Sequence, residues 1–195
     1  MQEQELVKQL QQGHREAFDQ LYLLYHRQAY RTAFFLTGNR ADAQDVVQET
    51  FVKVWFCAPQ LKDCDGFRSW FYRILTRMAF RKGSAQKREI PDAGISLLAD
   101  RGSEEDSLSG LLLKEEREQV RRAVDSLEEK HRAVIVLYYF NEFSTKEIAR
   151  ITGCLEGTVK SRLFAARRKL KKSLTAGSEP AVSAEINSFW KGSSV

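Results

Sequence analysis

The segment that most constrains the fold of this chain is Ser144–Leu170, STKEIARITGCLEGTVKSRLFAARRKL. Ser144 followed by Glu147 is the capping-box pattern of a helix N-terminus, and Gly153 suits the positive φ at which many helices end. Beyond the glycine, four apolar residues recur at helical spacing, namely Val159, Leu163, Ala166 and Leu170. The segment therefore predicts two short helices around a tight turn, a helix-turn-helix.

Charge and composition separate this segment from the chain before it. Residues 144–172 carry nine Lys or Arg against two acidic residues, whereas residues 89–118 carry nine acidic residues against three basic ones. Gly and Ser accumulate in residues 83–110, as is typical of a linker. The second domain should therefore be a basic module suited to an anionic partner. The predicted boundaries are a first domain at 1–85, a linker at 86–112, a second domain at 113–174 and a mobile tail at 175–195.

The rest of the chain is also patterned for helices. Before the linker, apolar spacing predicts helices at Glu3–Gln11, Ala17–Leu36, Ala41–Ala58 and Phe67–Lys82. After the linker, it predicts helices at Leu113–Leu127 and Arg132–Phe140. The β-branched residues of the last segment would also suit a strand, but its position between helices favours a buried helix. The predicted fold class is all-α, with two small helical domains joined by a flexible acidic linker.

Two helices of the first domain carry surfaces that each have two interpretations. Along Ala41–Ala58, the acidic residues Asp42, Asp45 and Glu49 share one side, which is either a solvated face or a docking ridge. Along Phe67–Lys82, arginines spaced four residues apart are interleaved with aromatic residues. This pattern suits single-stranded nucleic acid, because bases stack on rings while guanidinium groups contact phosphates. A surface helix that buries its aromatic residues would show the same pattern.

The sequence lacks the common motifs of catalysis and metal binding. It contains no GxxxxGK phosphate loop, no GxSxG and no HExxH, its three cysteines lack zinc spacing and its three histidines are scattered. We therefore expect no enzyme activity, no metal and no cofactor. The N-terminus is polar, unlike a signal peptide, and the longest uncharged apolar run is far shorter than the roughly 20 residues of a membrane span. The expected location is the reducing cytoplasm.

Three blocks of the sequence together resemble one family. ADAQDVVQETFVKVW, at Ala41–Trp55, is similar to the DAEDLVQETFLRVW-type signature of sigma factors, and FRSWFYRI, at Phe67–Ile74, resembles the WLYRI stretch that follows it. Leu127–Leu170 resembles the family's C-terminal helix-turn-helix region, including GTVKSRL. Their order and brevity resemble an extracytoplasmic-function (ECF) sigma factor, which keeps only the second and fourth conserved regions. The resemblance covers about residues 14–172.

The resemblance implies a subunit that binds core RNA polymerase, recognises the −10 and −35 promoter elements and promotes DNA melting. Docking on the clamp helices of the largest polymerase subunit is implied for Asp42, Asp45, Gln48 and Glu49. Recognition of −10 DNA is implied for Arg68, Trp70, Tyr72, Arg73, Arg77 and Arg81. Recognition of −35 DNA is implied for Thr158, Lys160, Ser161, Arg162, Phe164 and Arg168. The implied partners are core polymerase, including its flap region, promoter DNA and an anti-sigma factor, which in this family is often membrane-linked.

The sequence departs from the family pattern within these reading elements. Leu155 stands where many members have Ser, and Ala165 where many have Arg. Arg77 and Arg81 stand where Asn and Asp are common. The preferred promoter sequence is therefore not carried over. The alternative function is a helix-turn-helix regulator that does not replace sigma, which explains Ser144–Leu170 but neither the acidic side nor the aromatic–arginine helix.

Overall fold

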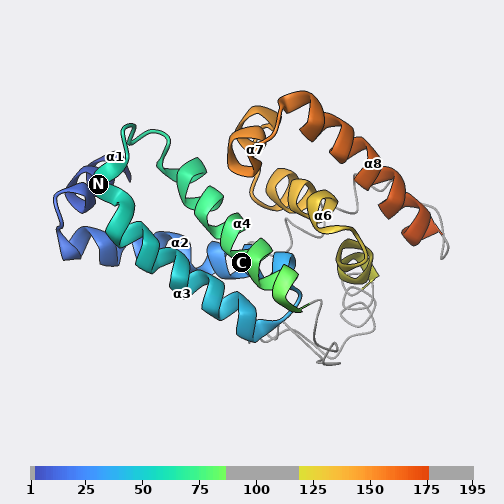
Figure 1. Ribbon diagram of the computed structural model, residues 1–195, viewed down its shortest axis with the longest axis horizontal. Helices are drawn as coiled ribbons and strands as arrows, with labels where there is room; N and C mark the ends of the chain where they lie inside the picture. Colours follow the sequence, from blue (N-terminus) through green and yellow to red (C-terminus); the bar gives the residue numbers. More distant parts are fainter. Residues whose placement is uncertain (1–2, 87–118, 176–195) are drawn as a thin grey trace, which may run out of the picture.

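The computed structural model describes residues 3–86 and 119–175, and every regular element in those ranges is helical. The first range holds α1 (Glu3–Gln11), α2 (Arg15–Thr37), α3 (Arg40–Cys57), the 3-10 turn η1 (Ala58–Gln60) and α4 (Phe67–Gln86). The second holds a helical segment at 119–125, α6 (Glu129–Ile135), the π-helical turn η2 (Val136–Phe140), α7 (Thr145–Thr152) and α8 (Glu156–Thr175). The all-α fold class is confirmed (Figure 1). Apart from their first residues, the predicted linker at 86–112 and tail at 175–195 lie outside the described residues.

Local sequence explains where several helices begin and end. Asn39 caps α3, because its side-chain oxygen accepts a hydrogen bond from the backbone N–H of Asp42 at 2.8 Å. The predicted capping box is confirmed at α7: Glu147 N donates to Ser144 Oγ at 3.3 Å, and Ser144 N donates to Glu147 Oε2 at 2.8 Å. Gly153 ends α7 at a φ of 70°, the left-handed conformation that glycine adopts without steric cost.

In the first domain, α2, α3 and α4 pack around an aromatic core. Three of its rings, one from each helix, lie together: Phe71 of α4 lies 4.9 Å from Tyr25 of α2 and 5.2 Å from Phe51 of α3, centroid to centroid. These separations fall in the favourable range for aromatic pairs. The arrangement holds α3 and α4 side by side, so the two helices with ambiguous surfaces become neighbours.

In the second domain, α6, α7 and α8 pack together, and the predicted helix at Arg132–Phe140 is confirmed in preference to a strand. It is not a uniform α-helix, because Asn141 N donates to Val136 O, five residues back, at 3.1 Å. The predicted apolar stripe of α8 is buried, with no member more than 3% exposed: Val159, Leu163, Ala166 and Leu170. This burial turns the opposite side of α8 outward.

The two domains are in contact with each other. α4 packs along α7, and α2 touches both α6 and η2, so segments distant in the sequence lie side by side (Figure 1). No sequence pattern predicted this contact. None of the described helices combines the length and apolarity needed to cross a membrane.

Candidate nucleic-acid interface

The outward side of α8 presents the side chains predicted to read bases. Lys160, Ser161 and Phe164 are all exposed, and Phe164 keeps 69% of its surface in contact with solvent. Lys160 Nζ lies 2.8 Å from Glu156 Oε1, one turn earlier, and Ser161 Oγ donates to Thr158 O at 3.0 Å. The hydrogen bond from Lys160 is the main cause that lowers the pKa of Glu156. A strong anion such as phosphate could compete for Lys160, because the ion pair is exposed and therefore weak.

The residues predicted to contact phosphates flank this face. Thr158 and Arg162 are half-buried at its edges, and Arg168 is exposed one turn beyond Phe164. Thr145 Oγ1 donates to Glu156 Oε1 at 2.7 Å, which ties the first residue of α7 to the first residue of α8. This hydrogen bond helps to hold the two helices of the helix-turn-helix in one orientation.

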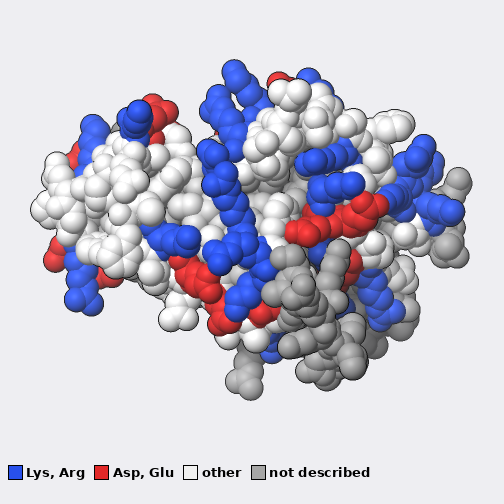
Figure 2. Space-filling view, in the orientation of Figure 1, with Lys and Arg blue, Asp and Glu red and all other residues white. Residues whose placement is uncertain are grey.

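A second basic surface runs along α4. Arg73, Arg77 and Arg81 are exposed at successive turns, as their spacing predicted, and Trp70 is half-buried beside them. Figure 2 shows Lys and Arg side chains gathered down the middle of this face of the molecule, over α4 and the neighbouring second domain. The structure thus brings three arginines of the predicted −10 set, Arg73, Arg77 and Arg81, together on one exposed line.

Two other members of the predicted −10 set face the second domain instead. Arg68 donates from a terminal guanidinium nitrogen to Asn141 O at 2.5 Å, and its guanidinium carbon lies 4.3 Å from the centroid of the Phe143 ring. Tyr72 is 1% exposed, and this burial raises the pKa of its phenol to about 12. In this arrangement Tyr72 is inaccessible to DNA, and Arg68 already has a partner.

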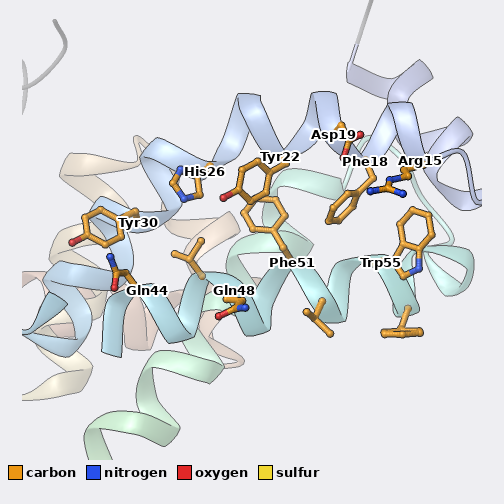
Figure 3. A pocket seen from close by; sticks show the side chains of 13 residues that line it. Arg15, Phe18, Asp19, Tyr22, His26, Tyr30, Gln44, Gln48, Phe51 and Trp55 are labelled. Carbon is orange, nitrogen blue, oxygen red and sulfur yellow. The ribbon is translucent and has the colours of Figure 1, made fainter. Parts of the chain in front are cut away.

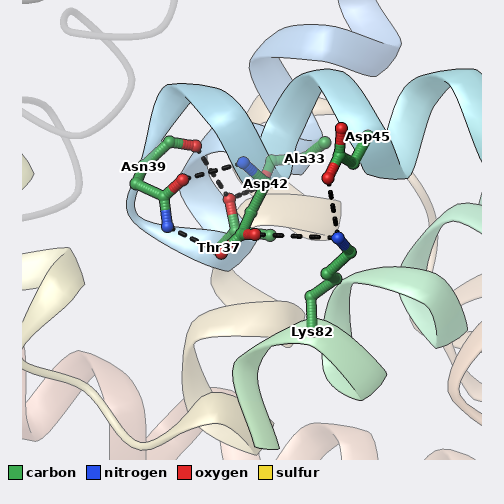
Figure 4. A network of polar contacts seen from close by, with 6 residues as sticks. All are labelled: Ala33, Thr37, Asn39, Asp42, Asp45 and Lys82. Carbon is green, nitrogen blue, oxygen red and sulfur yellow. Dashed lines mark hydrogen bonds and ion pairs between the residues drawn. The ribbon is translucent and has the colours of Figure 1, made fainter. Parts of the chain in front are cut away.

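The predicted acidic residues lie together on α3, where a lysine of α4 meets them. Asp45 and Glu49 are exposed, as is Gln48, whereas Asp42 is half-buried beside its capping partner. Lys82 Nζ lies 2.7 Å from Asp45 Oδ2 and 3.9 Å from Asp42 Oδ1 (Figure 4). The hydrogen bond to Asp45 is the main cause that raises the pKa of Lys82. We call Asp42, Asp45, Gln48 and Glu49 the acidic ridge.

A groove between α2 and α3 was not predicted. It has a volume of about 680 Å³, and Figure 3 shows rings from both helices along it. Its lining includes the rings of Phe18, Tyr22, His26, Phe51 and Trp55 and the side-chain amide of Gln48. The aromatic stripe of Ala17–Leu36 is typical of core packing, but Tyr22 remains 37% exposed. The sequence contained one signal for this groove: the apolar residues Val52 and Phe56 lie off the buried stripe of α3. In the structure they are 50% and 70% exposed.

Among the residues that the structure describes, no group of three or more His, Cys, Asp and Glu side chains is arranged to hold a metal ion.

Known proteins match the chain over most of its length. The family description Sigma-70 region 2 matches residues 21–89, and Sigma-70, region 4 matches residues 117–170. The RNA polymerase sigma-H factor of Pseudomonas aeruginosa is 31% identical over 181 residues, covering 89% of this chain and 94% of that protein. The ECF RNA polymerase sigma-E factor of Escherichia coli (strain K12) is 32% identical over 177 residues, covering 86% of this chain and 92% of that protein. The solved structure of CnrH in complex with the cytosolic domain of CnrY has a TM-score of 0.66 and 27% identity, covering 90% of this chain and 99% of that one.

Proposed function

Because this chain belongs to the ECF RNA polymerase sigma factors, we propose that it divides promoter initiation among three separate surfaces. The observation that carries the proposal is the two-sided character of α8, which buries Val159 and Leu163 and exposes Lys160, Ser161 and Phe164. A helix anchored on one side and polar on the other is suited to lie in the major groove of duplex DNA.

On the −35 duplex, Thr158, Arg162 and Arg168 contact phosphates, which positions the helix without specifying sequence. Lys160, Ser161 and Phe164 contact base edges. Phe164 can offer its ring to a thymine methyl group, and Lys160 can donate to guanine acceptors once it leaves Glu156. A good base-edge contact discriminates by about 1–3 kcal/mol, so these three residues carry the upstream specificity.

On the −10 element, the exposed arginines of α4 follow the backbone of the melted strand. Trp70 offers a ring on which an unpaired base can stack, a contact worth about 1–3 kcal/mol per base. Unstacking a base from duplex costs a few kcal/mol, so the stacking and arginine contacts together offset the cost of melting. Arg68 and Tyr72 join this surface only when the second domain moves away from them.

Core polymerase docks on the acidic ridge of α3 and on the adjoining groove. Gln48 belongs to both surfaces, which makes them continuous. The occupant is the clamp-helix region of the largest polymerase subunit, whose basic side chains would meet Asp45 and Glu49. Val52 and Phe56 add exposed apolar area that such a docked helix would cover. The second domain makes the second contact with polymerase, by binding its flap region.

An anti-sigma factor is the proposed inhibitory partner, and the cytoplasm is the proposed location. The structure of CnrH contains the cytosolic domain of a second protein, CnrY, which supports a protein partner for this chain as well. We further propose that this partner is membrane-linked.

Run-off transcription tests the proposal. Core polymerase and this chain are incubated with a random promoter library, and initiated sequences are selected and read. The expected result is transcription from one family of promoters without another sigma. Transcription that requires a second sigma would instead identify a helix-turn-helix regulator.

A further inference from the structure

Lys82 lies on a different side of α4 from the arginine line of Arg73, Arg77 and Arg81. It follows Arg81 directly, so it projects about 100° further around the helix. α4 packs along α3, and Lys82 points across this junction toward the acidic ridge (Figure 4). The Lys82 side chain is 33% exposed, whereas the three arginines are classed with the exposed residues. Lys82 therefore belongs to the proposed polymerase-docking surface and not to the −10 surface.

Two carboxylates of the ridge flank the Lys82 ammonium group. Lys82 Nζ lies 2.7 Å from Asp45 Oδ2 and 3.9 Å from Asp42 Oδ1. The Asp42 side chain is 13% exposed, and its other oxygen accepts a hydrogen bond from Asn39 Nδ2 at 2.7 Å, so Asp42 already takes part in the cap of α3. The Asp45 side chain is 54% exposed. Asp45 is therefore the carboxylate of this pair that a docking protein can reach.

The positive charge of Lys82 acts on the whole ridge. The pKa of Lys82 is raised chiefly by the hydrogen bond to Asp45, and the charges of Asp45, Asp42 and Glu49 raise it further. Electrostatic interaction is mutual, so Lys82 in turn offsets part of the negative charge that these three residues present. A surface suited to a basic partner is thus partly neutralised from within the chain.

A basic side chain of a docking partner would need the same carboxylate. An arginine that pairs with both oxygens of Asp45 would share Oδ2 with Lys82, and a lysine at Asp45 would lie beside Lys82 as well. Either arrangement brings like charges together, which costs free energy. The ion pair between Lys82 and Asp45 is itself exposed and therefore weak. The geometry thus favours replacement of Lys82 over the addition of a second cation.

We infer that Lys82 is an internal competitor for Asp45, which core polymerase displaces when it docks on the acidic ridge. The inference rests on the proposed docking of polymerase at this ridge. Apparent affinity falls with the fraction of molecules in which the binding group is not available. Lys82 therefore lowers the affinity of the chain for core polymerase, and with it the share of polymerase that the chain occupies at a given concentration.

The experiment measures the Kd of the full chain for immobilised core polymerase at one physiological salt concentration. Lys82→Met removes the ammonium group and keeps an unbranched apolar side chain, whereas Lys82→Arg keeps a cation at the same position. Lys53→Met is the matched control, because Lys53 is exposed on α3 and lies about 12 Å along the helix axis from Asp45. Thermal unfolding of each variant checks that the chain remains folded.

We expect Lys82→Met to bind core polymerase about three- to fivefold more tightly than the unmodified chain, because an exposed ion pair is formed only a few times more often than it is broken. Lys82→Arg should match the unmodified chain. Lys53→Met should change Kd by less than about twofold, since exposed charges further apart than about 8 Å are largely screened at this salt concentration. Weaker binding by Lys82→Met would overturn the inference, because Lys82 would then assist docking. An equal gain for Lys53→Met would also overturn it, because net charge alone would explain both.

Asp45→Asn separates the inference from the proposed function. This change keeps the size of the side chain and removes the charge for which Lys82 and polymerase compete. Asp45→Asn alone should weaken core binding, and Lys82→Met added to it should improve binding by less than about twofold, because the two residues act through one bond. An undiminished gain from Lys82→Met in the Asp45→Asn background would overturn the competition. Unchanged core binding by Asp45→Asn alone would instead refute the docking of polymerase on the ridge.

Discussion

Replacing Phe164 by alanine should weaken binding of the −35 duplex and leave the stability of the second domain unchanged. The Phe164 side chain is 69% exposed, whereas its neighbour Leu163 is 3% exposed, on the face of the same helix that packs inward. Substituting these two adjacent apolar residues one at a time therefore distinguishes an effect on DNA binding from an effect on stability.

The magnitudes follow from these environments. Loss of an apolar base contact by Phe164→Ala costs about 1–3 kcal/mol of binding, or roughly 5- to 150-fold in Kd. Its effect on unfolding should stay within about 0.5 kcal/mol, as for other exposed positions. Leu163→Ala removes buried methyl groups and should cost about 2–5 kcal/mol of stability. At about 4–8 °C per kcal/mol for a domain of this size, that loss lowers Tm by at least roughly 8 °C.

Fluorescence anisotropy with the duplex gives the Kd, and thermal unfolding gives Tm. Both proteins are compared at one salt concentration, because phosphate contacts make Kd strongly salt-dependent. A Tm drop for Phe164→Ala as large as that for Leu163→Ala would mean that the Phe164 ring stabilises the folded domain and is not free to contact DNA bases. An unchanged Kd for Phe164→Ala would remove this residue from the −35 surface.

Three further changes test other parts of the chain. Glu49→Lys should weaken binding to core polymerase in a pulldown without lowering Tm, since Glu49 is exposed on the acidic ridge; full retention of binding would exclude the ridge. Ser144→Ala should cost about 1 kcal/mol in urea unfolding because it breaks the capping box, and a cost near zero would mean that the box does not stabilise α7. The pKa of Glu128 is lowered from 4.5 to about 2, chiefly by the hydrogen bond from Lys169, so the folded state binds fewer protons than the unfolded state there. The resulting stability is present above about pH 4.5 and is lost as the pH falls toward 2, and Glu128→Gln should make Tm less dependent on pH across that window; identical pH profiles would contradict the assignment.

Local patterns in the sequence were sufficient for the elements and for the anchoring of the reading helix. The capping box at Ser144, the turn at Gly153 and the buried stripe of α8 all depend on residues within a few positions of one another. A helical period places side chains on one face or the other regardless of the rest of the chain, so the exposed face of α8 was predictable. The arginine line of α4 was predictable for the same reason.

Only the tertiary structure decided which faces are covered and by what. Aromatic residues at helical spacing, such as Tyr22, are typical of a core stripe, but no third element among the described residues covers the groove between α2 and α3, so the Tyr22 ring remains partly exposed. Lys82 reaches Asp45 because α3 and α4 pack side by side. The residue spacing within either helix does not predict that packing. The bond between Asn141 and Thr32 joins residues 109 positions apart. Phe143 of the second domain packs against Tyr72, which is 1% exposed. Pairings of this kind depend on the complementary shapes of surfaces that meet only after the helices have formed.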